Sequence, residues 1–152
     1  MTHKFKNISL DDLHVICVIE NESFQKPWKY LDFLKQMKAK DSDNKVILID
    51  NQIIGYMFAE IEEDKIYIAN MAIKEGHRRK KYGTEILNYL KARLEQCGKN
   101  TLYASVRETD LPLQMFFKNN GFLYIETLRD LYDDVKEDVY IFEYVRRVKK
   151  NG

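Results

Sequence analysis

The sequence predicts one α/β (α+β) domain built around a mixed sheet, and three observations support that prediction. Its 152 residues suit one compact domain. Apolar runs of strand type alternate with segments of helical spacing in the order β-α-α-β-β-β-α-β-α-β-β. We find no internal repeat and no linker rich in Gly, Ser or Pro, so the expected domain covers residues 1–152.

Seven apolar runs of β type are the expected strands. They span residues 5–9, 46–50, 53–60, 66–73, 101–106, 122–128 and 139–145. The second and third runs flank a polar turn, which predicts a hairpin. The fourth run shows little alternation of polar and apolar residues, so we expect a central strand that is buried on both faces.

Four segments with helical spacing are expected between these strands. Ser9 followed by Asp12 is typical of a capping box, and the first helix is expected to run to about Ser23. Pro27 suits the first turn of a short second helix. Asp110 is expected to cap the fourth helix. The third helix follows a basic loop and presents an apolar stripe formed by Ile86, Leu87, Leu90 and Leu94.

Composition and charge exclude several classes of protein. The formal net charge of +1 excludes a strongly polycationic nucleic-acid binder, and an aromatic content of 12% is too high for a disordered chain. The chain contains no apolar run typical of a signal peptide or a membrane span, so we expect a cytoplasmic protein with no membrane partner. Cys17 and Cys97 lie on apolar helical faces and are expected to be buried and reduced. The sequence leaves open whether the protein is a monomer or a homodimer.

A basic loop at residues 76–83, Gly-His-Arg-Arg-Lys-Lys-Tyr-Gly, joins the expected central strand to the third helix. The first N–H groups of a helix have no partner within it and the helix dipole is positive there, so this end binds phosphate readily. Four adjacent cations are unfavourable at a helix N-terminus unless an anion compensates them. The loop therefore predicts a site for an anion with two or more phosphates, and a solvated run of charges is the alternative. Its spacing differs from that of a nucleoside-triphosphate P-loop and from the three-glycine dinucleotide fingerprint.

At this loop the sequence resembles the GNAT superfamily of N-acetyltransferases, whose signature is Gln/Arg-x-x-Gly-x-Gly/Ala. Arg78 and Gly83 match the signature, and Lys81 stands where its first Gly usually is. Other segments are similar to bacterial ribosomal-protein-alanine N-acetyltransferases in the same order along the chain. These segments are residues 19–28, 101–107, 120–122 and 129–138.

The resemblance implies a mostly antiparallel sheet of about seven strands that is splayed between the fourth and fifth strands, with coenzyme A in the gap. The backbone at Met71, Ala72 and Ile73 would then bind the pantetheine arm, and one N–H group there would polarise the thioester carbonyl. The residues implied for the coenzyme phosphates are Arg78, Arg79, Lys80, Lys81, Tyr82, Gly83 and Thr84. Asp110 stands where many relatives have a coenzyme-contacting Asn, and Phe117 stands on the helix that follows. Acetyl-coenzyme A is thus the implied co-substrate, and no metal is expected.

The catalytic residues that the resemblance implies are changed in this chain. In relatives like the ribosomal-protein enzymes, a Glu on the fifth strand is the base and a Tyr in the next helix is the acid. Here Ser105 occupies the Glu position and Phe117 the Tyr position. The candidate substitutes are Tyr67, Ser105 as a water-orienting group, Tyr132 and Glu22. Each has a simpler interpretation, respectively as a packed strand tyrosine, a plain strand serine, a surface aromatic residue and a solvated acid.

Three functions remain open from the sequence. The first is acetyl-coenzyme-A-dependent acetylation of a primary amine, with a protein N-terminal α-amine as the acceptor that the subfamily resemblance implies. The second is acetylation of a small-molecule amine such as a polyamine or an aminoglycoside. The third is a non-catalytic acyl-coenzyme-A-binding module, which the changes at Ser105 and Phe117 suggest.

Overall fold

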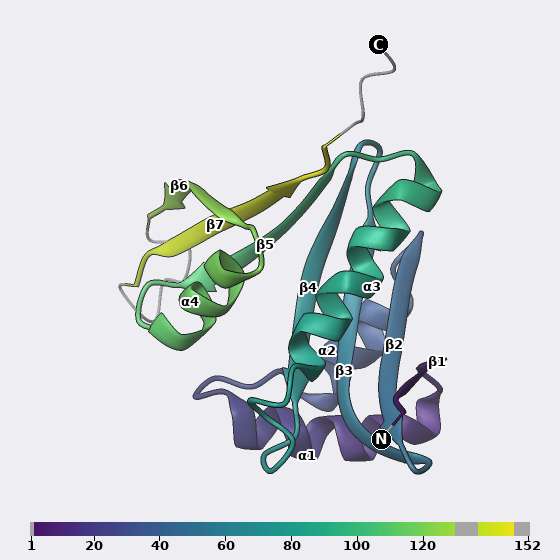
Figure 1. Cartoon of the computed structure of the whole chain (residues 1–152). Coiled ribbons are helices and arrows are strands. Elements are labelled where there is room, and N and C mark those ends of the chain that lie inside the picture. Colours follow the sequence, from purple (N-terminus) through teal and green to yellow (C-terminus); the bar gives the residue numbers. More distant parts are fainter. Residues whose placement is uncertain (1, 130–136, 148–152) are drawn as a thin grey trace. The chain divides into compact units, whose positions relative to one another are not determined.

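The computed structural model describes residues 2–129 and 137–147 (Figure 1). Its elements follow the predicted order, with one additional short 3₁₀ helix before the first α-helix. They are β1 (Lys4–Asn7), η1 (Leu10–Asp12), α1 (Leu13–Ser23), α2 (Tyr30–Met37), β2 (Ser42–Ile49), β3 (Gln52–Ile61), β4 (Lys65–Ile73), α3 (Tyr82–Cys97), β5 (Thr101–Arg107), α4 (Leu111–Asn119), β6 (Leu123–Leu128) and β7 (Val139–Val145).

The described strands form one seven-stranded sheet in the order β1-β2-β3-β4-β5-β7-β6. The β1–β2, β2–β3, β5–β7 and β6–β7 pairs are antiparallel, whereas β4 and β5 are parallel. The β4–β5 pairing joins Lys65–Ile68 to Thr101–Ala104, and both strands continue beyond these residues. The predicted mixed, mostly antiparallel architecture is confirmed.

The chain divides into two compact units. The first contains the described residues up to Ile61 together with Ala69–Ile86. The second contains Glu62–Ile68 and the described residues from Leu87 onward. The expectation that residues 1–152 form one domain stays a prediction.

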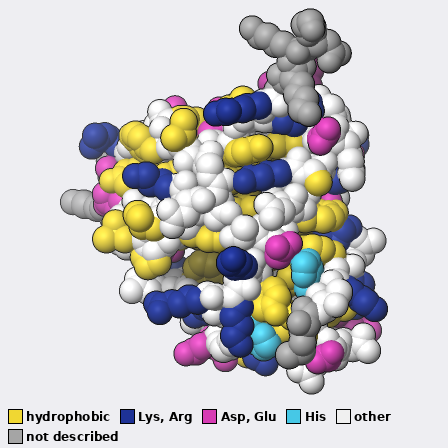
Figure 2. Space-filling model, in the orientation of Figure 1, with side chains coloured by type: hydrophobic (Ala, Val, Ile, Leu, Met, Phe, Trp, Pro, Cys, Tyr) yellow, Lys and Arg dark blue, Asp and Glu magenta, His cyan; other side chains and the backbone are white. Residues whose placement is uncertain are grey.

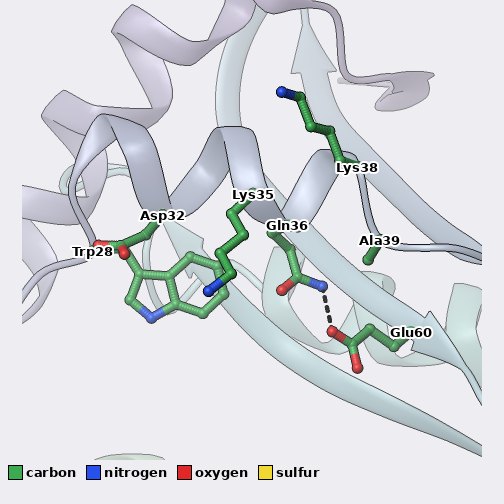
Figure 3. A pocket seen from close by; sticks show the side chains of 7 residues that line it. All are labelled: Trp28, Asp32, Lys35, Gln36, Lys38, Ala39 and Glu60. Atoms are coloured by element: carbon green, nitrogen blue, oxygen red, sulfur yellow. Dashed lines mark hydrogen bonds between the residues drawn. The ribbon is translucent and has the colours of Figure 1, made fainter.

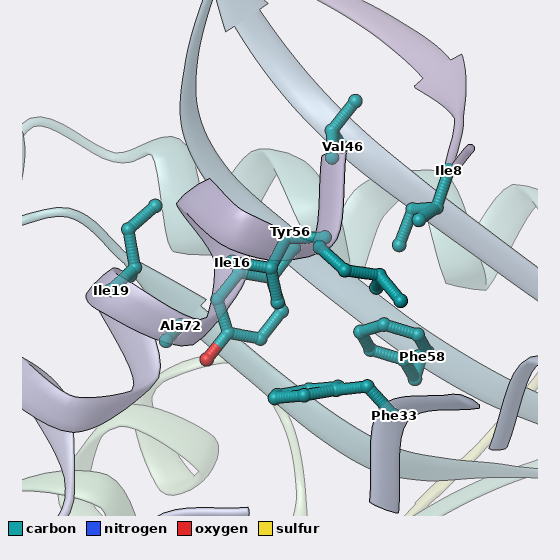
Figure 4. Close-up of a cluster of buried hydrophobic side chains, with 9 residues drawn as sticks. Ile8, Ile16, Ile19, Phe33, Val46, Tyr56, Phe58 and Ala72 are labelled. Carbon is teal, nitrogen blue, oxygen red and sulfur yellow. The ribbon is translucent and has the colours of Figure 1, made fainter. Parts of the chain in front are cut away.

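The core of the first unit is a cluster of aliphatic and aromatic side chains (Figure 4). Phe33 packs against two of its aromatic neighbours. The centroid of its ring lies 5.2 Å from that of Phe58 and 6.0 Å from that of Tyr56. Full burial of one such side chain contributes about 1.5–3 kcal/mol, so this cluster is a major source of stability for the unit. Its buried members are Ile8, Leu13, Ile16, Ile19, Phe33, Val46, Tyr56, Phe58 and Ala72.

The second unit has an aromatic core of its own. The Phe117 ring lies 5.0 Å from Phe122 and 6.3 Å from Phe142, measured between centroids. The apolar stripe predicted for the third helix is buried, with Ile86 in the first unit and Leu87, Leu90 and Leu94 in the second. The predicted cap of α4 is also confirmed, because the Asp110 carboxylate accepts a hydrogen bond of 3.2 Å from the Leu113 N–H.

Two local predictions about the elements are wrong in detail. Pro27 does not lie in the first turn of a helix: α2 begins at Tyr30, because Asp32 accepts the Lys29 N–H at 2.8 Å and completes a capping box there. The second strand begins at Ser42 rather than residue 46, because its polar first residues pair with the end of β3.

The cysteine prediction is also corrected. Cys17 and Cys97 are free thiols, but both are half-buried rather than fully buried. Partial burial and the nearby Glu20 raise the pKa of the Cys17 thiol, which favours its protonated form.

In the described part of the chain, no helix has the length and apolar character needed to cross a bilayer.

Candidate functional site

The basic loop between β4 and α3 has an unusual backbone. Three of its residues lie in the left-handed region, namely Gly76 (φ 92°), Arg79 (φ 62°) and Lys81 (φ 69°). Glycine adopts this conformation without cost, whereas Arg and Lys are strained in it. Strained backbone at two cationic positions of one loop is typical of a functional site.

This backbone presents N–H groups at the start of α3. Left-handed residues among right-handed ones form concave nests of N–H groups that bind anions. The first helical hydrogen bond of α3 joins the Glu85 N–H to the Lys81 carbonyl oxygen at 3.0 Å. The N–H groups of Tyr82, Gly83 and Thr84 therefore lie in the first turn, where a helix supplies no acceptor.

Cationic side chains surround these N–H groups. Arg79, Lys80 and Lys81 are exposed, and Figure 2 shows Lys and Arg side chains (dark blue) gathered over the loop that precedes α3. Cations at a helix N-terminus are unfavourable by about 0.3–1 kcal/mol each in the absence of an anion. Backbone and side chains thus combine into a surface suited to a multivalent anion, and the binding of an anion there stays a prediction.

Arg78 braces this loop against its surroundings. Its Nε donates to the Ile73 carbonyl oxygen at 2.8 Å, and its Nη2 donates to the Ser23 hydroxyl at 2.8 Å. The guanidinium thus joins the loop to the end of β4 and to the last turn of α1. A direct role for Arg78 in phosphate binding stays a prediction.

The end of β4 lies unusually close to β3. A Cβ atom added at Gly55 would meet the Ile73 Cδ1 at 2.7 Å and the Ala72 carbonyl oxygen at 2.8 Å. Glycine at this position therefore allows close approach of the two backbones. Met71 and Ile73 are half-buried and Ala72 is buried, so the predicted donor-binding segment of β4 is packed in place from the β3 side.

A buried polar cluster next to this segment was missed by sequence reasoning. The Glu20 side chain on α1 is only 2% exposed, and it accepts hydrogen bonds from the Trp28 N–H, the Tyr56 hydroxyl and the Asn70 side chain. Burial raises the pKa of Glu20 although these hydrogen bonds oppose the shift. Burial and the Glu20 charge also hold the pKa of Tyr56 well above its usual range. The available signal was a carboxylate on the apolar face of a predicted helix, because such residues are seldom buried unless they are paired.

The remaining predicted site residues do not all belong to the first unit. Tyr67, Ser105, Asp110 and Phe117 belong to the second unit, and Tyr132 lies outside the described residues. Glu22 is exposed on α1. Their catalytic or coenzyme-binding roles stay predictions.

Within the second unit, the surroundings of three of these residues are well defined. The Tyr67 ring lies 4.9 Å from the Tyr103 ring, whose hydroxyl donates to Glu62. Ser105 lies opposite Ile141 in the β5–β7 pairing. Phe117 is 2% exposed and belongs to the aromatic core of this unit, where it packs against Phe122 and Phe142.

A pocket of about 520 Å³ opens on the first unit beside α2 (Figure 3). Its lining residues are Trp28, Asp32, Lys35, Gln36, Lys38, Ala39 and Glu60. The Gln36 amide donates to Glu60 at 2.9 Å across this surface. None of the lining residues is a predicted site residue. No group of His, Cys, Asp and Glu side chains suited to a metal ion occurs in the part of the chain that the structure describes.

Comparison with known proteins gives a consistent result. The model of the acetyltransferase (GNAT) family matches residues 9–122. The chain is 24% identical to an N-alpha-acetyltransferase of Saccharolobus solfataricus over 149 residues, which cover 90% of this chain and 89% of that protein. It is 25% identical to the ribosomal protein bS18-alanine N-acetyltransferase of Haemophilus influenzae over 121 residues, 80% of this chain and 82% of that one. The crystal structure of the ribosomal-protein-S18-alanine N-acetyltransferase from Escherichia coli superposes with a TM-score of 0.85 at 20% identity and covers 99% of each chain.

Proposed function

This chain belongs to the acetyltransferase (GNAT) family, and we propose that it transfers the acetyl group of acetyl-coenzyme A to a protein N-terminal α-amine. The observation that carries the proposal is the cationic loop before α3, with Arg79 and Lys81 held in the left-handed conformation. Members of the family use acetyl-coenzyme A as co-substrate. A loop of this kind fits the diphosphate of that molecule better than it fits a neutral ligand.

The donor is expected to bind along the end of β4 and across the loop. The N–H groups of residues 79–84 are the proposed donors to the diphosphate oxygens, with Arg79, Lys80 and Lys81 as counter-charges. The backbone of Met71, Ala72 and Ile73 is the proposed partner of the pantetheine arm. One N–H group in this segment would stabilise the negative charge that develops on the thioester oxygen during attack.

The reaction that fits this site is direct attack by the amine. The amine nitrogen forms a bond to the acetyl carbon, the carbon–sulfur bond breaks, and coenzyme A leaves as a thiolate that takes up a proton. A protein α-amine has a pKa of about 8, so it must lose a proton before or during attack. We propose Tyr67, Ser105, Tyr132 and Glu22 as the candidates for this proton transfer, with Ser105 acting through a bound water.

The names of two relatives support the choice of acceptor. One is an N-alpha-acetyltransferase, and the other is a ribosomal-protein alanine N-acetyltransferase. Both names describe the acetylation of an α-amine in a protein. The segment of residues 19–28 resembles the corresponding segment of the ribosomal-protein enzymes, which is why we place the acceptor on a protein rather than on a small molecule.

A single assay tests this proposal. Release of coenzyme A thiol is measured with acetyl-coenzyme A and a panel of N-terminal peptides, polyamines and aminoglycosides. We expect turnover with peptides that have a free N-terminus and none with the same peptides after chemical acetylation of the α-amine. Turnover confined to polyamines or aminoglycosides would contradict the proposed acceptor. Binding of acetyl-coenzyme A without turnover of any amine would contradict the proposed enzyme.

A further inference from the structure

The buried carboxylate of Glu20 joins three separate segments of the first unit. Its Oε1 accepts from the Trp28 backbone N–H at 3.1 Å and from Asn70 Nδ2 at 3.0 Å. Its Oε2 accepts from the Tyr56 hydroxyl and from Asn70 Nδ2, the latter at 2.9 Å. One side chain on α1 therefore contacts the loop between α1 and α2, the middle of β3 and the second half of β4.

These contacts exclude Glu20 as a free acid or base. Three donors share its two oxygens: the Trp28 N–H, the Tyr56 hydroxyl and the Asn70 amide, whose Nδ2 lies within hydrogen-bond distance of both. Glu20 is also only 2% exposed, so a substrate amine has no direct access to it. A buried carboxylate held by three donors acts through the groups it binds.

The groups bound by Glu20 lie in two segments: the end of β4 that is assigned to the donor, and the loop between α1 and α2, which this proposal assigns to the acceptor. Asn70 directly precedes Met71, the first residue of the β4 segment assigned to the acetyl thioester. Trp28 lies in the loop between α1 and α2, and its indole packs against Phe33 at 5.3 Å and Phe58 at 6.2 Å between ring centroids. Figure 4 shows that the Tyr56 ring lies in the same apolar cluster, with its hydroxyl directed away from Ile8 and Val46.

We propose that Glu20 is a positioning residue, which holds the α1–α2 loop through Trp28 and the donor-binding end of β4 through Asn70 in one fixed arrangement. The inference rests on the proposed function, because Met71–Ile73 are assigned to the thioester there. Arg78 supplies a second link between the same elements through Ser23 and Ile73. Glu20 is therefore expected to set the alignment of acceptor and donor rather than the affinity for the coenzyme.

The first test uses Trp28, which is the only tryptophan of the chain, as a reporter of the loop. Acrylamide quenching of its fluorescence is measured in Glu20→Ala and Glu20→Gln. The alanine variant leaves the Trp28 N–H without its buried acceptor, so we expect quenching to increase about twofold. The glutamine variant keeps an acceptor oxygen and should quench like the wild type. Equal quenching in all three folded proteins would overturn the proposal, and this readout needs no enzymatic activity.

The second test measures acetyl transfer. Asn70→Ala breaks the link to β4 but keeps the link from Glu20 to Trp28. We expect kcat to fall about 10- to 100-fold, because a small misplacement of reacting groups is costly. We also expect the Kd for acetyl-coenzyme A to change less than about threefold, since the basic loop is untouched. Glu95→Gln, at an exposed position on α3, is the control and should match the wild type.

The outcomes separate positioning from chemistry. Glu20→Gln should keep the pH–rate profile of the wild type, whereas loss of the acidic limb of that profile would show that Glu20 transfers a proton and would overturn the proposal. A wild-type kcat in Asn70→Ala would overturn it as well. If the wild type transfers acetyl groups to no amine, the proposed function fails, and the quenching of Trp28 still decides whether Glu20 holds the loop.

Discussion

Lys81 is a lysine in a backbone conformation that favours glycine, with φ at 69°. The left-handed conformation costs a non-glycine residue about 1–2 kcal/mol. Glycine removes that cost but loses about 0.5–1 kcal/mol through the greater freedom of the unfolded chain. We therefore expect Lys81→Gly to raise the free energy of unfolding by about 0.5–1 kcal/mol in urea denaturation.

Lys80→Gly is the matched control, because Lys80 is an adjacent exposed lysine without a positive φ. It removes the same charge and adds the same freedom to the unfolded chain, so it should lower the free energy of unfolding. A difference between the two variants of less than a few tenths of a kcal/mol would contradict the inferred strain at Lys81.

Glu20 should make the folded protein less stable as pH rises, whereas most carboxylates in folded proteins have the opposite effect. Because burial raises its pKa, its contribution to stability is complete below the pKa of the unfolded chain, about 4.3, and is lost as pH rises through the higher folded value. The free energy of unfolding of Glu20→Gln, minus that of the wild type, should therefore increase from pH 4 to pH 8. Tyr56 and Cys17, which face Glu20, have raised pKa values, so neither of them titrates in the acidic part of this range.

Urea denaturation of both proteins across this range measures the effect. Parallel pH curves for the two proteins would show that the folded and unfolded pKa values of Glu20 are the same.

Glu20 also shows which kind of contact between single residues cannot be predicted from the sequence. Its partners Tyr56 and Asn70 are 36 and 50 residues away along the chain, and no local pattern indicates such contacts.

At the scale of elements, the order and type of strands and helices could be predicted because hydrophobic periodicity is a local property. The residues at which each helix or strand begins and ends depend also on contacts with other segments, and hydrophobic periodicity does not indicate those contacts. Trp28 shows why: its N–H binds Glu20 rather than a helical carbonyl, so the segment after Pro27 stays extended until Lys29. The left-handed residues of the basic loop were also not predictable, since only Lys81 coincides with a glycine of the family signature.

The close approach of β3 and β4 at Gly55 yields a prediction for these two strands. A Cβ at this position meets the Ala72 carbonyl oxygen, which belongs to the backbone and cannot move without moving β4. We expect Gly55→Ala to lower the free energy of unfolding by about 1–3 kcal/mol. We also expect weaker binding of acetyl-coenzyme A, because Ala72 and Ile73 are displaced from their packed positions.

Gly98→Ala separates these two effects. Gly98 has a φ of 68° and no atom within 4 Å of its added Cβ, so its substitution causes backbone strain without a clash. It should lower stability by about 1–2 kcal/mol and leave coenzyme affinity unchanged. Isothermal titration and urea denaturation of both variants measure the two quantities. Equal coenzyme affinity in Gly55→Ala and the wild type would argue against β4 as the donor-binding strand.

At the scale of the whole molecule, the fold could be predicted because several moderately specific segments recur in the order of the GNAT family. A specific prediction for the site is possible from the sequence only where the site is local, at residues 71–84, and this assignment stays a prediction. Proton transfer could not be assigned, because Ser105 and Phe117 replace the groups that the resemblance implies and their candidate substitutes are scattered along the chain. Donor binding is therefore the part of the proposed function that the geometry of the basic loop supports most directly.

Acetyl-coenzyme A should stabilise the folded protein, and its phosphates should be necessary for this effect. A ligand present at 100 times its Kd adds about 2.7 kcal/mol to the free energy of unfolding, which thermal denaturation detects readily. We expect a clear rise in Tm with acetyl-coenzyme A and none with acetyl-pantetheine, which lacks the diphosphate. The rise should shrink at high salt, because exposed charges are screened.

Lys81→Glu should remove most of this protection, because one charge-assisted contact is worth about 1.5–3 kcal/mol and the reversed charge repels the diphosphate. Lys118→Glu changes net charge equally at an exposed position on α4, so it controls for the overall field of the protein. Equal protection in both variants would place the diphosphate away from the loop. Because net charge is the same in the two variants, only the position of the lysine can explain a difference between them.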